Sequence, residues 1–116
     1  MSNVIAVDDT TFTAAVEGSD AGLVLVDFWA PWCVPCRLMG PVVDAVAAKY
    51  AGRLRVVKVD VDRSPLTAYR FGIRSIPTIT LFKNGEPVGG FSGFATKATI
   101  DVLLRSEIPP LHAGVS

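Results

Sequence analysis

The sequence has very little cysteine and histidine, no excess charge of either sign and no long apolar run. Its 116 residues include 2 cysteines and 1 histidine, His112. A structural zinc site usually needs two cysteine pairs, or cysteines together with histidines, so the ligands for a metal site are lacking. The 11 basic and 11 acidic residues cancel, which argues against a nucleic-acid partner. No run is long enough to cross a membrane.

The N-terminal residues also lack a recognisable targeting signal. The segment from Met1 to Asp9 has neither the basic region nor the apolar stretch of a secretory signal. We therefore expect a cytoplasmic protein, and in that compartment a lone cysteine pair is more often catalytic or redox-sensing than structural. The length fits one domain, which we expect to span residues 1–108, with a flexible tail over residues 109–116.

Both cysteines lie in the segment Trp32-Cys33-Val34-Pro35-Cys36, between a strand-like run and a helix-like run. Cys33 is therefore expected at or beside a helix N-terminus, where free amide groups and the helix dipole favour a thiolate. Cys36 follows almost one turn later and can reach the first sulfur, so the spacing predicts a reversible disulfide. Two unrelated buried thiols are an alternative. A purely stabilising disulfide is disfavoured, because so short a loop removes little entropy from the unfolded chain.

Apolar spacing and turn residues predict the order of helices and strands. We expect strands at residues 4–7, 23–29, 54–61, 78–83 and 86–92, and helices at 12–16, 33–50, 65–70 and from Thr96 to before Ile108. Asn84-Gly85 predicts a tight hairpin between the last two strands. The residues from Asp8 to Thr11 offer caps for the first helix, and Thr96 can cap the last one. The apolar face of the long helix is expected to contain Leu38, Val42, Ala45 and Val46.

Asp27 and Lys58 each interrupt an otherwise apolar strand. A buried carboxylate without partners is costly or takes up a proton, so Asp27 needs an explanation. If the two strands are neighbours, the two charges could meet beneath the cysteines, and Asp27 could exchange protons with Cys36. An ordinary, partly buried ion pair explains the pattern equally well.

Two further residues near the cysteines have less certain roles from spacing alone. Trp32 lies between the end of a strand and the start of a helix, which favours an exposed side chain that contacts a partner, although packing against the loop is an alternative. Pro77 begins a strand, where a missing backbone donor is tolerated. Its isomer does not follow from the spacing.

Several motifs together resemble the thioredoxin family over about residues 4–107. They are Asp27-Phe28-Trp29-Ala30 with Trp32-Cys33-x-Pro35-Cys36, Gly72-Ile73-Arg74-Ser75-Ile76-Pro77-Thr78, Phe82-Lys83-Asn84-Gly85 and the late Gly93. The resemblance implies an α/β fold with a central, mixed five-stranded sheet flanked by four helices. It also implies that Pro77 is cis beside the disulfide, that Cys33 is the exposed attacking cysteine, and that Cys36 is the buried resolving one. Asp27 with Lys58 would handle protons.

The same resemblance implies a flat docking surface for partner proteins. Its residues would be Trp32, Val61, Gly72, Ile76, Gly93 and Phe94, together with Val34 and Pro35 between the cysteines. Val34 replaces the family's usual glycine, and Phe94 is bulkier than the small residue expected after Gly93. The β-branched valine stiffens the first helical turn and adds apolar surface where substrates approach.

These observations predict a cytoplasmic protein-disulfide reductase that binds no cofactor or metal. It would reduce oxidised target proteins through transient mixed disulfides and be regenerated by an NADPH- or ferredoxin-dependent thioredoxin reductase. We expect a monomer with no nucleic-acid or membrane partner. A thiol oxidase or isomerase of the same fold is an alternative, although such proteins usually carry a histidine between the cysteines. A non-catalytic adaptor is another.

Overall fold

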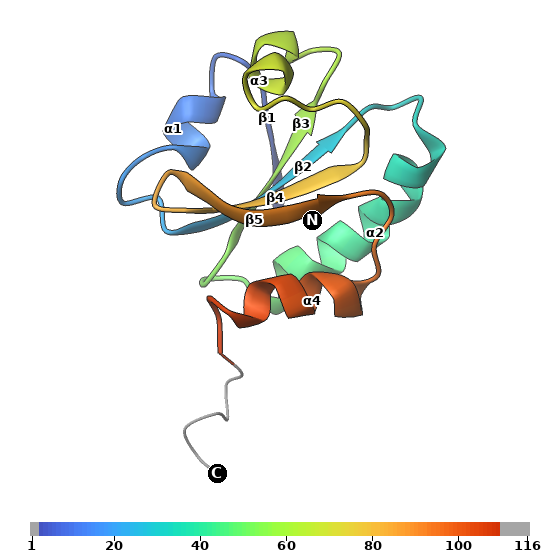
Figure 1. The fold of residues 1–116 in the computed structure, drawn as a ribbon. Helices are drawn as coiled ribbons and strands as arrows, with labels where there is room; N and C mark the ends of the chain where they lie inside the picture. The colour runs from blue at the N-terminus through green and yellow to red at the C-terminus, as the bar shows by residue number, and fades with distance from the viewer. Residues whose placement is uncertain (1–2, 110–116) are drawn as a thin grey trace.

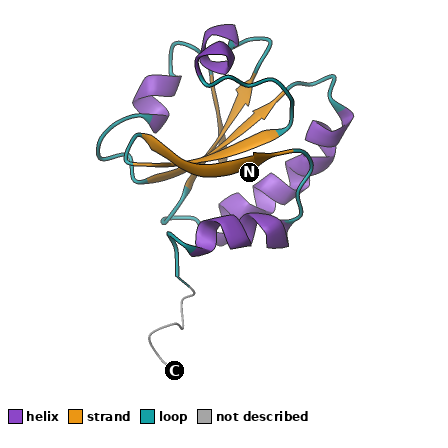
Figure 2. Ribbon diagram, in the orientation of Figure 1, coloured by secondary structure: helices purple, strands orange, loops and turns teal. Residues whose placement is uncertain are grey.

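A computed structural model describes residues 3–109 of the chain (Figures 1 and 2). The elements follow the order β1 (Val4–Val7), α1 (Phe12–Val16), β2 (Leu23–Trp29), α2 (Val34–Lys49), β3 (Arg55–Asp60), α3 (Pro65–Arg70), β4 (Thr78–Lys83), β5 (Glu86–Ser92) and α4 (Lys97–Arg105). The expected order is confirmed. The strand expected at residues 54–61 is one residue shorter at each end. Most of the expected tail, residues 110–116, lies outside the described residues.

The strands form one mixed sheet in the order β1-β3-β2-β4-β5. The first three strands of this order are parallel, and β4 and β5 are antiparallel to their neighbours. Parallel strands need crossover connections, which α1 and α2 supply. The carboxyl ends of β1, β3 and β2 therefore lie at the same end of the sheet, and Cys33 lies just beyond the end of β2.

Helices cover both faces of the sheet, with α1 and α3 on one face and α2 and α4 on the other (Figures 1 and 2). Strand β2 is buried on both sides, as its continuous apolar run predicts. Leu25 points into the cluster formed with α2 and α4. Val24 and Val26 point into the other cluster, which contains Phe12 of α1.

The buried face of α2 differs from the expected one. Leu38 is 63% exposed and Ala45 is also exposed, whereas the buried residues are Cys36, Met39, Val43, Val46 and Ala47. The helix carries two overlapping apolar rows at helical spacing, and both fit the same period. The disulfide turns Cys36 inward, and the row that continues from it at three- and four-residue steps packs on the sheet.

The acidic residues before α1 do not cap it as expected. Thr11 occupies the N-cap position without a side-chain cap bond. Asp8 instead accepts hydrogen bonds from the backbone of Thr10 and Thr11 in the preceding turn. Asp9 accepts hydrogen bonds from the backbone amides of Leu66 and Thr67 at the start of α3. The Asp9 side chain, which precedes α1 in the sequence, thus satisfies free amides at the start of α3.

Two other local predictions are confirmed. The Thr96 hydroxyl accepts a hydrogen bond from the Thr99 amide at 3.3 Å and caps α4. Asn84 and Gly85 have φ angles of 48° and 90°, the positive values that a type I′ hairpin turn requires.

Within residues 3–109 no helix is long and apolar enough to cross a membrane. The same residues contain no group of three acidic, cysteine or histidine side chains placed to hold a metal ion.

Candidate redox site

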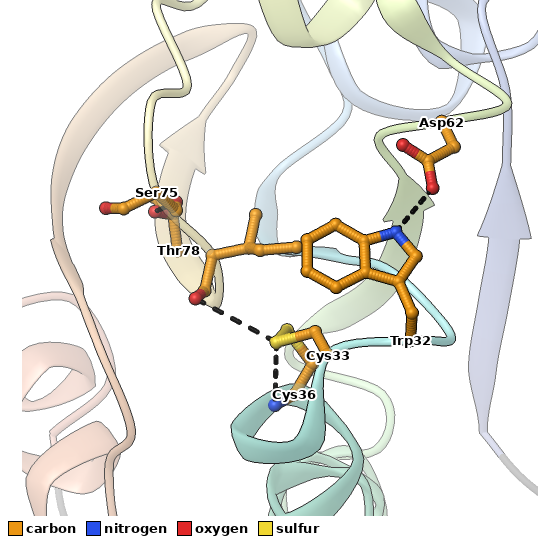
Figure 3. Close-up of a disulfide and its surroundings, with 7 residues drawn as sticks. Trp32, Cys33, Cys36, Asp62, Ser75 and Thr78 are labelled. Carbon is orange, nitrogen blue, oxygen red and sulfur yellow. Dashed lines mark hydrogen bonds between the residues drawn. A yellow bond between two sulfur atoms is a disulfide. The ribbon is translucent and has the colours of Figure 1, made fainter.

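The two cysteines are joined by a disulfide at the start of α2 (Figure 3). Cys33 is the N-cap residue, Val34 and Pro35 begin the helix, and the cysteine Cα atoms are 5.2 Å apart. Strand β2 ends only a few residues earlier, at the carboxyl edge of the parallel strands. The predicted pairing and the predicted position of Cys33 are therefore confirmed.

The helix N-terminus directs an amide donor at the first sulfur. The backbone N–H of Cys36 donates to Cys33 Sγ, with a distance of 3.2 Å from N to S (Figure 3). Pro35 has no N–H, so its place in the first turn leaves no additional donor without a partner. Once the disulfide is reduced, this amide and the helix dipole favour a thiolate at Cys33.

Cys33 is not exposed in this disulfide form. Its exposed fraction is 4% and that of Cys36 is 3%, so the expected contrast between an exposed and a buried cysteine is wrong here. The physical reason is packing around the disulfide. Cys33 Sγ lies 3.9 Å from the Ile76 carbonyl oxygen, and both cysteines form a cluster with Ala30 that Val61 and other half-buried apolar residues cover.

The loop that carries Ile76 is fixed by hydrogen bonds on both sides of Pro77. The Ile76–Pro77 bond is cis, as the family resemblance implied, and Pro77 is buried. The Gly93 amide donates to the Pro77 carbonyl oxygen at 2.8 Å. The Thr78 hydroxyl donates to the Ser75 carbonyl oxygen at 2.6 Å. These bonds bring Gly93 and Pro77 together next to Ile76, whose carbonyl oxygen lies beside the disulfide.

Trp32 is 66% exposed, as predicted. Its indole N–H donates to Asp62 Oδ2 at 2.7 Å (Figure 3). Sequence reasoning missed Asp62, which lies 30 positions away in the loop after β3. Only the adjacency of the ends of β2 and β3 brings these two residues together.

The other residues of the expected docking surface differ in burial and in their position relative to the cysteine cluster. Val61 and Ile76 are half-buried and pack against the cysteine cluster. Val34 and Phe94 are 58% and 53% exposed, and Pro35 is also exposed. Gly72 lies at the end of α3, outside the cysteine cluster. Exposed Leu38, one turn after Val34 on α2, adds an apolar side chain that the sequence had assigned to the buried face.

Asp27 is buried in β2, and neither carboxylate oxygen has a hydrogen-bond partner among the described residues. It is in register with Lys58 on β3 and Ile79 on β4. Burial raises the pKa of Asp27 to about 6, although the positive charge of Lys58 opposes that rise. A carboxyl group that titrates near neutral pH can both accept and return a proton under ordinary conditions.

Lys58 approaches Asp27 without forming an ion pair. Its Nζ lies 4.0 Å from the centroid of the Trp29 ring, in a cation–π contact. The salt bridges found within residues 3–109 do not include this lysine. Asp27 and Lys58 are therefore neighbours, as expected. They do not form the ordinary ion pair that the sequence left as an alternative.

Comparisons with known proteins agree on one family. The family model described as Thioredoxin matches residues 3–106. Thioredoxin 1 of Nostoc sp. is 47% identical over 108 residues, which cover 93% of this chain and all of the relative. Thioredoxin of Haemophilus influenzae is 41% identical with the same coverage. Thioredoxin M-type, chloroplastic, of Pisum sativum is 47% identical over 93% of this chain and 62% of its own length.

Proposed function

The chain belongs to the thioredoxin family and is a protein-disulfide reductase, and we propose that Cys33 makes the attack on the target. The Cys33 thiolate attacks one sulfur of a target disulfide. A bond forms between Cys33 and that sulfur, the target disulfide breaks, and the other target sulfur leaves as a thiolate. The Cys36 amide and the α2 dipole support this assignment, because both stabilise charge on Cys33.

In the second step Cys36 releases the target. Asp27 in its ionised form takes the proton of the Cys36 thiol, and the resulting thiolate attacks Cys33 Sγ. The mixed disulfide breaks, the target leaves as a second thiolate, and the Cys33–Cys36 disulfide forms. Two electrons have then passed from this protein to the target. The pKa of Asp27, raised by burial to about 6, supports its role as the proton acceptor.

We assign target docking to the apolar surface around the disulfide. Its members are Trp32, Val34, Pro35, Val61, Gly72, Ile76, Gly93 and Phe94, with Pro77 holding the loop beside Cys33. Trp32, Val34 and Phe94 are all exposed, which supports this assignment, since exposed large apolar groups are typical of interaction surfaces. Lys58 is assigned the supporting role of keeping the Asp27 pKa from rising further.

The observation that carries the proposed cycle is the placement of Cys33 at the N-cap of α2 with Cys36 in its first turn. Insulin reduction in the presence of dithiothreitol tests it. The parent should accelerate reduction, and Cys33→Ser should not. Cys36→Ser should instead accumulate a mixed disulfide with the target through Cys33. A trapped complex in Cys33→Ser but not in Cys36→Ser would reverse the assigned order of attack.

Thioredoxins act on target proteins and are reduced by thioredoxin reductases, which is the general partnership of the family. For this chain we propose a monomer in the cytoplasm, a domain that spans residues 1–108, and a reductase that draws electrons from NADPH or ferredoxin. Reduction rates with each class of reductase test the electron source. Sedimentation of the purified protein tests the monomer, and cell fractionation tests the location.

A further inference from the structure

Helix α2 carries a row of apolar residues on the side that faces away from the sheet. Val34, Leu38, Pro41 and Ala45 are all exposed and follow one another at steps of four, three and four residues. Such steps keep side chains on one face of an α-helix. The residues that α2 buries lie on its opposite side, so the helix is apolar on both. The outer side of a surface helix is normally polar, which makes this row a candidate contact surface.

The row begins at the disulfide. Val34 lies between the two cysteines at the start of α2, and Leu38 follows one turn later. Their exposed fractions are 58% and 63%. Side chains four positions apart on a helix are neighbours, about 5–6 Å apart between Cβ atoms, and they tilt toward the helix N-terminus. Leu38 therefore leans toward Val34 and the disulfide. We call Val34, Leu38 and Pro41 the α2 ridge.

A target that reacts with Cys33 has to lie against the start of this ridge. Cys33 is 4% exposed in the disulfide form, whereas reacting atoms must approach to about 3–3.5 Å. The target chain on either side of its cysteine therefore covers the residues that surround Cys33, of which Val34 is the next along the chain. The α2 ridge is continuous with that contact, which identifies the target itself as the occupant of the ridge.

The length and charge of the ridge limit what it can bind. From Val34 to Pro41 the helix rises about 10 Å, at about 1.5 Å per residue, which equals about three residues of extended chain. Arg37 and Asp44 are exposed and lie beside Pro41 on the helix surface, four residues before it and three after it. Their charges are opposite in sign, so the border of the ridge favours neither an acidic nor a basic target. Apolar contact is left as the basis for selection.

We propose that the α2 ridge binds an apolar side chain that lies within about three residues of the attacked cysteine in the target, and that Leu38 determines this preference. Contact with Leu38 removes apolar surface of both side chains from water, which favours the complex. The inference rests on the proposed function and adds a substrate class to it, namely oxidised proteins with a large aliphatic side chain beside the disulfide. Leu38 acts on binding, since it lies outside the cluster formed by the cysteines.

Reduction of two symmetric peptide disulfides tests the proposal. One peptide carries leucine two positions before and two positions after its cysteine, and the other carries alanine at both positions. Each turnover gives two peptide thiols and the Cys33–Cys36 disulfide, which dithiothreitol returns to the dithiol, and the rate with dithiothreitol alone is subtracted. In the parent, kcat/KM for the leucine peptide should be roughly fivefold higher, the factor given by burial of about 40 Å² of apolar surface. The difference should appear in KM, because the reacting sulfurs are the same.

Matched variants assign the preference to the ridge. Leu38→Ala should reduce the ratio between the two peptides to less than about twofold, and Leu38→Met, which keeps a large apolar side chain, should preserve it. Val102→Ala is the control and should behave like the parent. Val102 is 60% exposed on α4, and its neighbour Asp101 accepts a hydrogen bond from the Tyr50 hydroxyl at 2.7 Å, at the far end of α2 from the disulfide. All variants are also assayed on a small aromatic disulfide, which reports the state of the redox site.

The outcomes separate the ridge from the redox cycle. An unchanged peptide ratio in Leu38→Ala, or an equal loss on both peptides and on the small disulfide, would overturn the proposal. A second copy of this chain on the ridge would also overturn it, and would appear as a parent rate per molecule that falls with increasing protein concentration while that of Leu38→Ala does not. Failure of the parent to reduce insulin or either peptide would instead contradict the proposed function. Equal rates of the parent on both peptides, with insulin reduced, would contradict the ridge alone.

Discussion

Asp27 brings a carboxyl group into the interior, with neither oxygen hydrogen-bonded among residues 3–109. The group is buried beside a positive charge that it does not touch, and the two effects oppose each other. Burial is the larger effect and raises the pKa of Asp27 from 3.8 to about 6. The same single residue therefore affects both stability and the proton transfer proposed for the release step.

The stability effect of Asp27 has a definite sign. The folded protein holds the proton more tightly than the unfolded chain, so the cost of the carboxylate is absent below pH 3.8 and complete above about pH 6. A pKa difference of this size corresponds to about 3 kcal/mol. Asp27→Asn does not titrate, so its unfolding free energy relative to the parent should rise by about that amount across this range.

Urea unfolding of the oxidised proteins at a series of pH values measures this difference. Asp20→Asn, at an exposed position, is the control and should show no such trend. A flat difference for Asp27→Asn would mean that the folded protein does not perturb this carboxyl group. In the reduced state the same variant should release mixed disulfides more slowly, because an amide cannot accept the Cys36 proton.

Asp62 accepts the indole N–H of an otherwise exposed Trp32 and so limits where the ring can lie. Asp62→Ala should free the ring and lower kcat/KM for protein targets by roughly fivefold, equivalent to about 1 kcal/mol for one exposed hydrogen bond. Asp62→Asn keeps an acceptor oxygen and should lose less. Reduction of a small aromatic disulfide, which does not need the docking surface, should be unchanged by either variant.

Steady-state kinetics on insulin and on the small disulfide provide the comparison. An equal loss on both substrates in Asp62→Ala would show that the residue acts on the redox chemistry instead of on docking. The contact itself could not be found from the sequence. Exposure of Trp32 followed from local position, but its partner depends on the pairing of β2 with β3.

At the scale of elements, local patterns predicted most boundaries and failed where tertiary packing chose between equivalent patterns. The hairpin turn and the Thr96 cap depend on neighbouring residues and were predictable. The buried row of α2 was not, because Leu38 and Met39 belong to two apolar rows with the same period. Asp9 was assigned to the nearer helix, although the fold brings it to α3.

Strand β5 contains two adjacent glycines whose surroundings differ sharply. A Cβ at Gly90 would collide with the backbone carbonyl of Ile79 on β4, whereas at Gly89 the nearest atom is the flexible end of Leu103, at 3.1 Å. Gly90→Ala should therefore lower the unfolding free energy by about 3 kcal/mol, the upper range for an overpacked site. Gly89→Ala should change it by less than about 1 kcal/mol.

Chemical unfolding of the two alanine variants under identical conditions gives a matched comparison, because the substitutions are adjacent in the same strand. Similar losses in both would contradict the close approach of β5 to β4 at Gly90. Gly89 lies in the middle of β5 against Leu103 of α4, so the reduction of insulin by folded protein should be retained in Gly89→Ala.

For the whole molecule, the parallel arrangement of β1, β3 and β2 determines where chemistry can occur. Their carboxyl ends lie at the same end of the sheet, and the redox site follows β2 at that end. The alternation of strands and helices was sufficient to predict a mixed sheet between helices. The burial of Cys33 was not predictable, since it depends on loops that converge only in the folded chain.

The proposed domain boundary at residue 108 can be tested by shortening the chain. Ile108 is buried in the cluster shared by α2 and α4, and its amide donates to the Leu104 carbonyl oxygen at 2.8 Å. Pro109 is exposed. A chain that ends after Ile108 should therefore keep the unfolding free energy of the full chain to within about 0.5 kcal/mol, the usual range for changes outside the core.

Ile108→Ala in the full chain is the matched comparison and should lose about 2–4 kcal/mol through the cavity it leaves. Urea unfolding of the full chain, the shortened chain and this variant decides the question. If shortening costs as much as Ile108→Ala, residues beyond 108 stabilise the domain and the boundary lies further on. If Ile108→Ala costs nothing, the core ends earlier, at Leu104, and α4 closes the domain without the turn that follows it.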